Sequence, residues 1–215
     1  SALSKTNKNK LTSKEIVSIS GVSAAVIATA ARNGLLNEEL IPRDRPYPRL
    51  NPDFKPKRLN PNQISVCEKI KNIQKQNSFS AILLQGVTGS GKTEVYLEAV
   101  ADALRKGEQI LVLLPEIALT SEFFDRVKKR FGENPAEWHS GVTLAERRRV
   151  WKMVASGGAK LVIGARSALF LPFINLGLII VDEEHDHSYK QEDGVIYNAR
   201  DMAVLRASIE MATVI

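Results

Sequence analysis

From residue 62 onward, short apolar runs alternate with segments of helical periodicity. Runs rich in Val, Ile and Leu are typical of strands that are buried on both faces of a parallel sheet. The segments between them repeat apolar residues every three or four positions, as helices do. The pattern therefore predicts an α/β fold in which helices cover both faces of a parallel sheet. The expected strands are 81–85, 109–114, 161–164, 178–181 and 212–215, and the expected helices are 62–75, 94–105, 119–131, 143–155 and 199–210.

Residues 1–41 show a different pattern. Ser, Lys and Asn dominate residues 1–10, which predicts disorder there. Thr12 and Glu15 have the spacing of a capping box ahead of a short helix, and a second helix is expected at 24–32. A short apolar run follows, which gives the order helix, turn, helix, strand. This order predicts a small winged-helix-like α+β domain that binds DNA.

The second of these helices has few side chains that could read bases. It is almost entirely small and apolar, whereas base readout needs Arg, Asn, Gln or Lys on an exposed face. Sequence-specific binding is therefore not expected. Contact with the DNA backbone, recognition of DNA shape, or simple packing fits the sequence better.

A proline-rich, basic segment, residues 42–61, separates the two patterns. It holds six of the nine prolines, which excludes a helix and predicts an extended, semi-rigid linker between two domains. The net charge of +6 comes entirely from residues 1–60, where eleven Lys and Arg oppose five Asp and Glu. Such an excess can attract a polyanion such as nucleic acid, or it can belong to a solvated terminal arm.

The composition fits one or two globular domains, because 44% of the 215 residues are hydrophobic and 25% are charged. No apolar run reaches about 18 residues and no signal-peptide pattern is present, so no membrane association is expected. The single cysteine, Cys67, cannot form an internal disulfide. A reducing cytoplasm is the expected location.

A glycine-rich turn follows the strand expected at 81–85. It fits the pattern G-x-x-x-x-G-K-[ST] of phosphate-binding loops. Its glycines let backbone N–H groups approach a polyphosphate, Lys92 offers a charge to the β- and γ-phosphates, and the Thr93 hydroxyl can bind Mg²⁺. The helix that follows favours phosphate at its N-terminus. The expected nucleotide-binding residues are Gly86, Val87, Thr88, Gly89, Ser90, Gly91, Lys92 and Thr93.

A second polar cluster follows the apolar strand expected at 178–181. Ligands of open α/β sheets gather at the carboxyl ends of the strands, so Asp182 is expected near the phosphate loop. Asp182 suits a Mg²⁺-holding carboxylate, and Glu183 is placed to act as a general base on the attacking water. The alternative is an acidic turn without catalytic function. His185 can equally be an ordinary surface histidine.

The phosphate loop and the Asp-Glu-Glu-His sequence at 182–185 together resemble motifs I and II of superfamily 2 helicases of the DExH, or DEAH-box, type. Within that superfamily the combination is similar to the bacterial primosomal helicases of replication restart. The resemblance extends over residues 59–215. Three further stretches carry it, namely 59–63 with the adenine-reading element, 114–120 with motif Ia and 163–168 with motif Ib.

The resemblance implies an ATP-dependent 3′-to-5′ DNA helicase that acts at stalled forks and assembles a primosome. Residues 62–215 then form a P-loop RecA-like lobe that uses ATP and Mg²⁺. The resemblance makes Lys92, Asp182 and Glu183 catalytic and gives Gln63 a contact with adenine. The residues that it assigns to DNA contact or coupling are His185, Tyr189, Lys190, Tyr197, Arg200 and Arg166.

Several expectations concern what lies outside this chain. The resemblance implies a second lobe with an arginine finger and zinc-binding cysteines, so zinc is expected only there. A chain without them is expected to bind ATP but to hydrolyse it poorly. The partners implied are forked DNA with single-stranded and duplex junctions, primosome proteins and single-stranded-DNA-binding protein.

Two other functions remain open on the sequence. One is a different DExH enzyme, such as an RNA helicase or another translocase. The other is a non-catalytic adaptor that binds nucleic acid and keeps a vestigial nucleotide fold. The intact Lys92, Thr93, Asp182 and Glu183 favour an enzyme.

Overall fold

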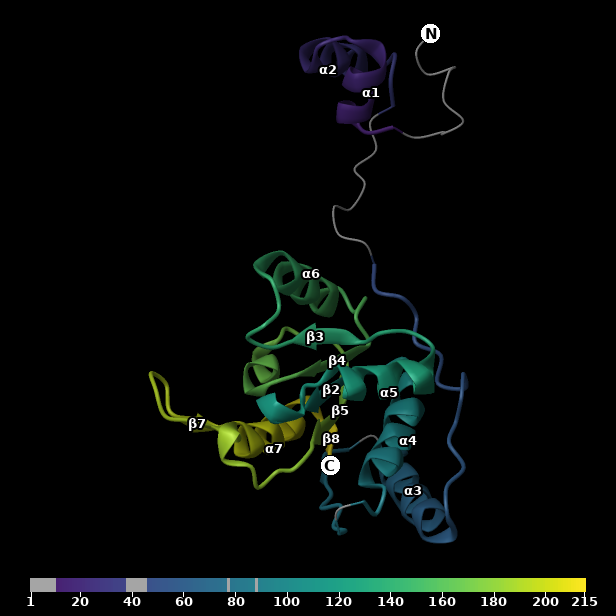
Figure 1. Cartoon of the computed structure of the whole chain (residues 1–215), viewed down its shortest axis with the longest axis vertical. Coiled ribbons are helices and arrows are strands. Elements are labelled where there is room, and N and C mark those ends of the chain that lie inside the picture. Colours follow the sequence, from purple (N-terminus) through teal and green to yellow (C-terminus); the bar gives the residue numbers. More distant parts are fainter. Residues whose placement is uncertain (1–10, 38–45, 77, 88) are drawn as a thin grey trace. The chain divides into compact units, whose positions relative to one another are not determined.

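The chain divides into an N-terminal unit and a C-terminal unit, with the boundary between Arg45 and Pro46. Expectations for residues 1–10, for 38–41 and for the first part of the proline-rich segment fall outside the described residues. The computed structural model describes every residue outside four short segments, which are 1–10, 38–45, 77 and 88 (Figure 1).

Two short helices, α1 (Ser13–Ser20) and α2 (Ala24–Arg32), make up the described part of the N-terminal unit. The predicted capping box is present, because the Thr12 hydroxyl accepts the Glu15 N–H while the Glu15 carboxylate accepts the Thr12 N–H at 2.8 Å. The strand of the winged-helix prediction is not found in residues 33–37.

Six parallel strands form the sheet of the C-terminal unit, in the order β1-β8-β5-β2-β4-β3 (Figure 1). The predicted α/β fold with a parallel sheet is confirmed. All carboxyl ends meet at one edge because the strands run the same way. The strands are β1 (Ser80–Ala81), β2 (Gln109–Leu113), β3 (Ala136–Trp138), β4 (Leu161–Gly164), β5 (Leu176–Val181) and β8 (Thr213–Val214).

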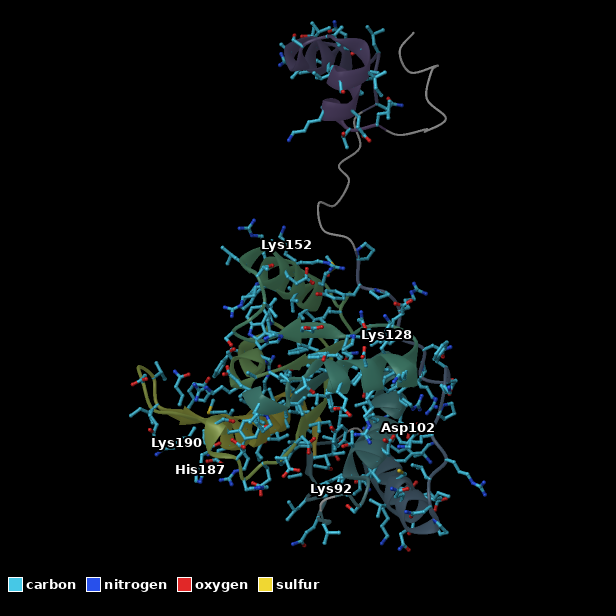
Figure 2. The ribbon with its side chains drawn as sticks, in the orientation of Figure 1. Lys92, Asp102, Lys128, Lys152, His187 and Lys190 are labelled. Atoms are coloured by element: carbon cyan, nitrogen blue, oxygen red, sulfur yellow. The ribbon has the colours of Figure 1, made fainter. Side chains whose placement is uncertain are left out.

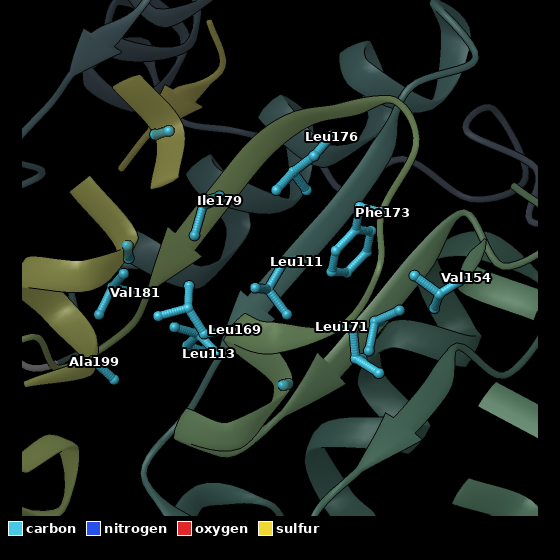
Figure 3. Close-up of a cluster of buried hydrophobic side chains, with 14 of the residues drawn as sticks. Leu111, Leu113, Val154, Leu169, Leu171, Phe173, Leu176, Ile179, Val181 and Ala199 are labelled. Carbon is cyan, nitrogen blue, oxygen red and sulfur yellow. The ribbon is translucent and has the colours of Figure 1, made fainter. Parts of the chain in front are cut away.

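Helices cover both faces of this sheet. Alternate residues of β2 point to opposite faces: Leu111 and Leu113 pack in one core and Ile110 and Val112 in the other. Figure 3 shows the first core, which α6, α7 and the turn η3 close. The second core lies under α3, α4 and α5. The bounds are α3 (Pro61–Gln74), α4 (Lys92–Arg105), α5 (Ser121–Phe131), α6 (Leu144–Ala155), η3 (Arg166–Phe170) and α7 (Ala199–Glu210).

Short strands are where the sequence prediction is wrong or incomplete. The strand expected at 81–85 is only Ser80–Ala81. Its neighbour β8 is itself two residues long, and the last hydrogen bond between the two segments runs from the Ile82 N–H to the Val214 oxygen. Strand β3 and a hairpin of two-residue strands, β6 (Lys190–Gln191) and β7 (Tyr197–Asn198), were not expected. Segments this short carry no detectable period. The described residues also form the turns η2 (Glu116–Ala118) and η4 (His187–Tyr189).

The proline-rich segment also differs from its prediction. Residues 46–60 lack helix and strand, as the prolines require, but they pack onto the C-terminal unit and so belong to it. The Asn51 N–H donates to the Phe131 oxygen at 2.9 Å, and Tyr47 and Leu50 pack against the two cores. Apolar side chains between the prolines therefore anchor to the C-terminal unit a segment that the sequence predicts to be an extended, semi-rigid linker.

Two buried glutamines have opposite environments. Gln109, at the start of β2, donates to the Val154 and Ala159 oxygens, both at 3.0 Å. Its own oxygen accepts the N–H groups of residues 174 and 175. Gln74, at the end of α3, is buried with no partner for either side-chain polar atom. Only the first amide is therefore expected to stabilise the fold.

Replacing each glutamine by methionine tests this difference. Gln109→Met removes four hydrogen bonds between a buried amide and main-chain groups, and we expect the free energy of unfolding to fall by about 3 kcal/mol. Gln74→Met removes two unpartnered polar atoms, so the free energy should stay the same or rise by about 1 kcal/mol. Urea denaturation of both variants measures the effect. Equal losses in the two variants would contradict the assignment.

Candidate functional site

The phosphate loop leads from β1 into α4 through a turn that only glycine can make. Gly91 has a φ of +83°, and a Cβ there would lie 2.3 Å from Gln63 Nε2. A Cβ on Gly86 would lie 2.7 Å from Ser90 Oγ. The glycine-rich turn is therefore as tight as the motif predicts, although Thr88 of the motif lies outside the described residues.

Gln63 joins the start of α3 to this loop. Its side-chain oxygen accepts the Asn60 N–H at 2.9 Å, and its Nε2 donates to the Ser90 oxygen at 3.1 Å. Asn60 in turn accepts the Gln63 N–H, which completes a capping box. Both ends of the amide are thus engaged within the protein, and the adenine contact stays a prediction.

Lys92 begins α4 at the centre of the site. Its ammonium donates to the Gly86 oxygen at 2.9 Å and lies 4.0 Å from Glu183 Oε1. Figure 2 shows its side chain at the phosphate-loop end of the C-terminal unit. The two halves of the site predicted from the sequence therefore meet, with the cation of one facing the acid of the other.

Hydrogen bonds engage the N–H, the main-chain oxygen and the carboxylate of Asp182. Its N–H donates to the Leu113 oxygen at 3.1 Å. Its own main-chain oxygen accepts from the Tyr189 hydroxyl at 2.7 Å. The carboxylate accepts from the Tyr96 hydroxyl at 2.9 Å and from the Glu183 N–H at 3.0 Å. The side chain can therefore present only one orientation to the cleft.

The environment of Asp182 favours a bound cation. Burial raises the pKa of Asp182, the Tyr96 hydrogen bond lowers it and the Glu183 charge raises it, with a net increase. Burial and Asp182 raise the pKa of the Tyr96 hydroxyl while Thr93 lowers it, so this hydroxyl lies near both expected Mg²⁺ ligands. A hydroxyl and a buried carboxylate are hard oxygen donors of the kind that Mg²⁺ prefers. The residues present fit that ion.

Glu183 has a left-handed backbone, with a φ of +48°. Such a conformation costs a non-glycine residue of order 1 kcal/mol and is characteristic of functional sites. The Asp186 N–H stabilises it by donating to the Glu183 oxygen at 2.8 Å. The half-exposed carboxylate lies between Lys92 and the His185 ring, whose Nε2 is 3.7 Å from Oε2.

A cleft of about 670 Å³ opens where these groups meet. It lies at the carboxyl edge of the sheet, the usual place for ligands of such folds. Its polar lining includes Gly86, Lys92, Tyr96, Asp182, Glu183, His185 and Arg200.

Tyr189 does not lie where the sequence placed it. It is only 1% exposed, so it cannot stack on a base in this structure, and its hydroxyl also reaches the Leu113 oxygen at 3.0 Å. The main-chain oxygens at two strand ends accept its hydroxyl and hold the tyrosine inside the protein. Arg166 reaches the same segment from the end of β4, since its Nη1 donates to the Ser188 and Lys190 oxygens at 3.2 and 2.5 Å.

The remaining coupling residues are more accessible. Tyr197 packs edge-on against the exposed Phe170, with ring centroids 5.2 Å apart. Lys190 pairs with Glu192 on the hairpin at 2.8 Å, and Figure 2 shows its position. Arg200 pairs with Glu184 at 3.0 Å beside the cleft. The structure thus groups Arg200 and His185 with the nucleotide site and Lys190 with the hairpin.

Two supports of the site were missed in the sequence. Tyr96 lies four residues after Lys92, a helical spacing that places both on one side of α4 and could have indicated its role. Glu94 is buried and pairs with Lys57 at 2.8 Å and with Arg126. Burial raises the pKa of Glu94, but the hydrogen bonds from Lys57 and Arg126 lower it by more. The net pKa is therefore below the ordinary value, and the carboxylate stays charged.

Other classes of site are not found in the described part of the chain. No group of three His, Cys, Asp or Glu side chains could hold a metal ion there. No single described helix is long and apolar enough to span a membrane, although the bent pair α1 and α2 meets that test on length and composition alone.

Residues 60–213 match the sequence model of the DEAD/DEAH box helicases. The chain belongs to the DEAD/DEAH box helicase family. It is 48% identical over 168 residues to the replication restart protein PriA of Rickettsia conorii, covering 75% of this chain and 26% of that protein. It is 40% identical over 200 residues to PriA of Bacillus subtilis, covering 92% of this chain and 25% of that protein. The chain thus spans about a quarter of these relatives.

A solved structure supports the fold of this helicase lobe. RecG bound to a three-way DNA junction superposes with a TM-score of 0.52 at 24% identity, over 74% of this chain and 24% of that one. The parallel sheet covered on both faces and this likeness fit a RecA-like lobe.

The glycine requirement of the phosphate loop can be tested with a matched pair. Gly91→Ala and Gly107→Ala both place alanine at a positive φ, which costs of order 1 kcal/mol of stability each. Only the first brings a Cβ against Gln63, because nothing lies within 4 Å of Gly107. We expect at least a tenfold loss of affinity for a fluorescent ATP analogue in Gly91→Ala alone. Equal affinities of the two variants for the ATP analogue would contradict a role of Gly91 in the phosphate loop.

The Tyr96 hydroxyl offers a second test. Tyr96→Phe removes a donor to a buried carboxylate, so Mg²⁺-dependent ATP affinity should fall about tenfold, since hydrogen bonds to charged groups are worth about 1.5–3 kcal/mol. Tyr47→Phe is the control, because Tyr47 donates to the Glu146 carboxylate outside the cleft. Nucleotide titrations with and without Mg²⁺ measure both. A loss in both variants would show a general effect of destabilisation.

Proposed function

We propose that this chain forms the first ATP-binding lobe of an ATP-dependent DNA helicase that restarts replication at stalled forks. The observation that carries the proposal is the meeting of Lys92 with Glu183, 4.0 Å apart, beside a fully bonded Asp182. Family membership supports ATP-driven strand separation. Relatives named replication restart protein support the biological setting.

The residues of the cleft divide the chemistry of ATP hydrolysis between them. Lys92 meets the β- and γ-phosphates, helped by the N-terminus of α4. Thr93 and Asp182 would hold Mg²⁺, which neutralises phosphate charge when bound. Glu183 orients the attacking water and accepts its proton. Gln63 contacts adenine from the start of α3, next to the loop that it already braces.

Efficient hydrolysis requires an arginine from another part of the protein. Among the described residues that line the cleft, Arg200 is the only arginine, and Glu184 holds it at 3.0 Å. An arginine that stabilises the transition state contributes about 10³–10⁵ in rate in related phosphoryl transfers. The lobe alone is therefore expected to bind ATP and to hydrolyse it slowly.

DNA contact is assigned to the segments beside the nucleotide cleft. Lys190 and Tyr197 lie on the hairpin, and Arg166 supports the hairpin from the end of β4. Tyr197 would stack on a base and Lys190 would meet a phosphate. Tyr189 links this segment to Asp182 from within the core, and His185 reports nucleotide state beside Glu183.

The finer features proposed are those of the whole protein. They are 3′-to-5′ movement, forked DNA with single-stranded and duplex junctions as substrate, and primosome proteins and single-stranded-DNA-binding protein as partners. We place the activity in the cytoplasm, where bacterial DNA is replicated. Zinc is proposed only for segments outside this chain.

The test uses the full-length protein that carries this lobe. Lys92→Ala removes the phosphate-facing charge, so DNA-stimulated ATPase and fork unwinding should fall about 100-fold or more, while DNA affinity stays within about twofold. Lys69→Ala, at an exposed position of α3, is the control and should leave all three unchanged. Unwinding of duplex RNA in preference to forked DNA, or full ATPase activity in Lys92→Ala, would overturn the proposal.

A further inference from the structure

Both tryptophans of the chain lie together, away from the nucleotide cleft. Trp138 ends β3 and Trp151 lies on α6, with ring centroids 6.4 Å apart and planes at 42°. Trp138 is partly buried, whereas Trp151 is 48% exposed. An indole that is half exposed beside another indole is a large apolar surface that the fold does not use for its core.

Trp138 is fixed to the segment that follows β4. Its indole N–H donates to the Ser167 hydroxyl at 3.1 Å, next to Arg166. The strands come close here, since Trp138 pairs with Gly164 in the ladder and a Cβ on that glycine would lie 2.3 Å from the Trp138 oxygen. The backbone of β3 at Trp138 therefore lies one strand spacing, about 4.8 Å, from the β4 end that supports the proposed DNA contact.

The outer face of α6 is strongly basic around Trp151. The helix carries Arg147, Arg148, Arg149 and Lys152 against one acid, Glu146, which pairs with Arg149 at 3.0 Å. Arg148 is exposed and has no hydrogen bond or ion pair among the described residues. Figure 2 shows Lys152 projecting from this helix. The patch combines an aromatic ring with the exposed guanidinium of Arg148.

Arg147 holds the patch in place. Its Nη2 donates to the His139 and Ser140 oxygens at 2.8 and 3.2 Å, and its guanidinium lies 5.8 Å from the centre of the Trp138 ring. The loop after β3 and the indole are thus tied to α6. A surface fixed in this way can accept a planar ligand without first becoming ordered.

We propose that Trp151, backed by Trp138 and flanked by Arg148, is a base-stacking contact that extends the path of a single DNA strand from the end of β4 onto α6. The inference rests on the proposed function. Indole faces accept any base, and arginine pairs with the phosphates between bases, which is the combination that binds single strands without sequence preference. The net positive charge of α6 complements a nucleic acid and opposes a basic protein partner.

Tryptophan fluorescence reports directly on this surface, because these two residues are the only tryptophans among the 215 residues. In a Trp138→Phe variant all indole emission comes from Trp151, and single-stranded oligothymidylate should quench it. Trp151→Ala should bind that oligonucleotide about tenfold more weakly, and Trp151→Phe less so, since a ring remains. Arg148→Ala should lower the salt dependence of binding by about one ion.

Lys128→Ala, a charge removal on α5, is the matched control and should leave emission and affinity unchanged. Thermal melts of each variant show whether the lobe stays folded. The inference is overturned when oligothymidylate binds, measured by anisotropy, while Trp151 emission and the affinity of Trp151→Ala and Trp151→Phe stay at parent values. Absence of all DNA binding by the folded chain would refute the proposed DNA contact as well.

Discussion

The immobilisation of Asp182 is the constraint on which the site depends. Its N–H donates to Leu113 of β2, and its carboxylate accepts from Tyr96 of α4. The buried Tyr189 hydroxyl donates to its main-chain oxygen. An unpaired buried group would cost about 1–3 kcal/mol, so each bond restricts the same strand end. The position of Asp182 thus follows from β5 pairing with β2 at the centre of the sheet. The acid cannot shift unless that pairing, or one of the two tyrosines, shifts too.

Tyr189 extends this constraint towards the proposed DNA segments. Its hydroxyl reaches the main-chain oxygens of Leu113 and Asp182, the last residues before two different functional stretches. Lys190, the next residue, begins the hairpin and is held by Arg166 from β4. A displacement of the hairpin therefore strains bonds that end on Asp182. This gives a physical route by which the proposed DNA contact and the proposed nucleotide site affect each other's affinity, because coupling free energies between binding sites are reciprocal.

The sequence predicted those parts of the site that are local in the chain. The phosphate loop and Asp182 with Glu183 follow from short motifs, because each is a strand end whose chemistry is written in consecutive residues. Tyr189 could not be placed, since its polar neighbours suggest a surface loop and its burial depends on oxygens 76 and 7 residues away. The same reason explains the packed proline segment, which is anchored by a partner on α5. Two- and three-residue strands leave no period to detect.

Strand order places the two proposed binding sites next to each other. In the order β5-β2-β4, the central strand β2 pairs with the strand that leads to Asp182 on one side and with the strand that leads to Arg166 on the other. The segment that follows β2, residues 114–120, is therefore the only backbone among the described strand ends that borders both neighbours directly. Its first residue, Leu114, donates to the Gly164 oxygen at 3.0 Å, while Leu113 accepts from Asp182. The single peptide group that joins Leu113 to Leu114 thus bonds to Asp182 after β5 on one side and to the end of β4 on the other, which couples the positions of the two strand ends.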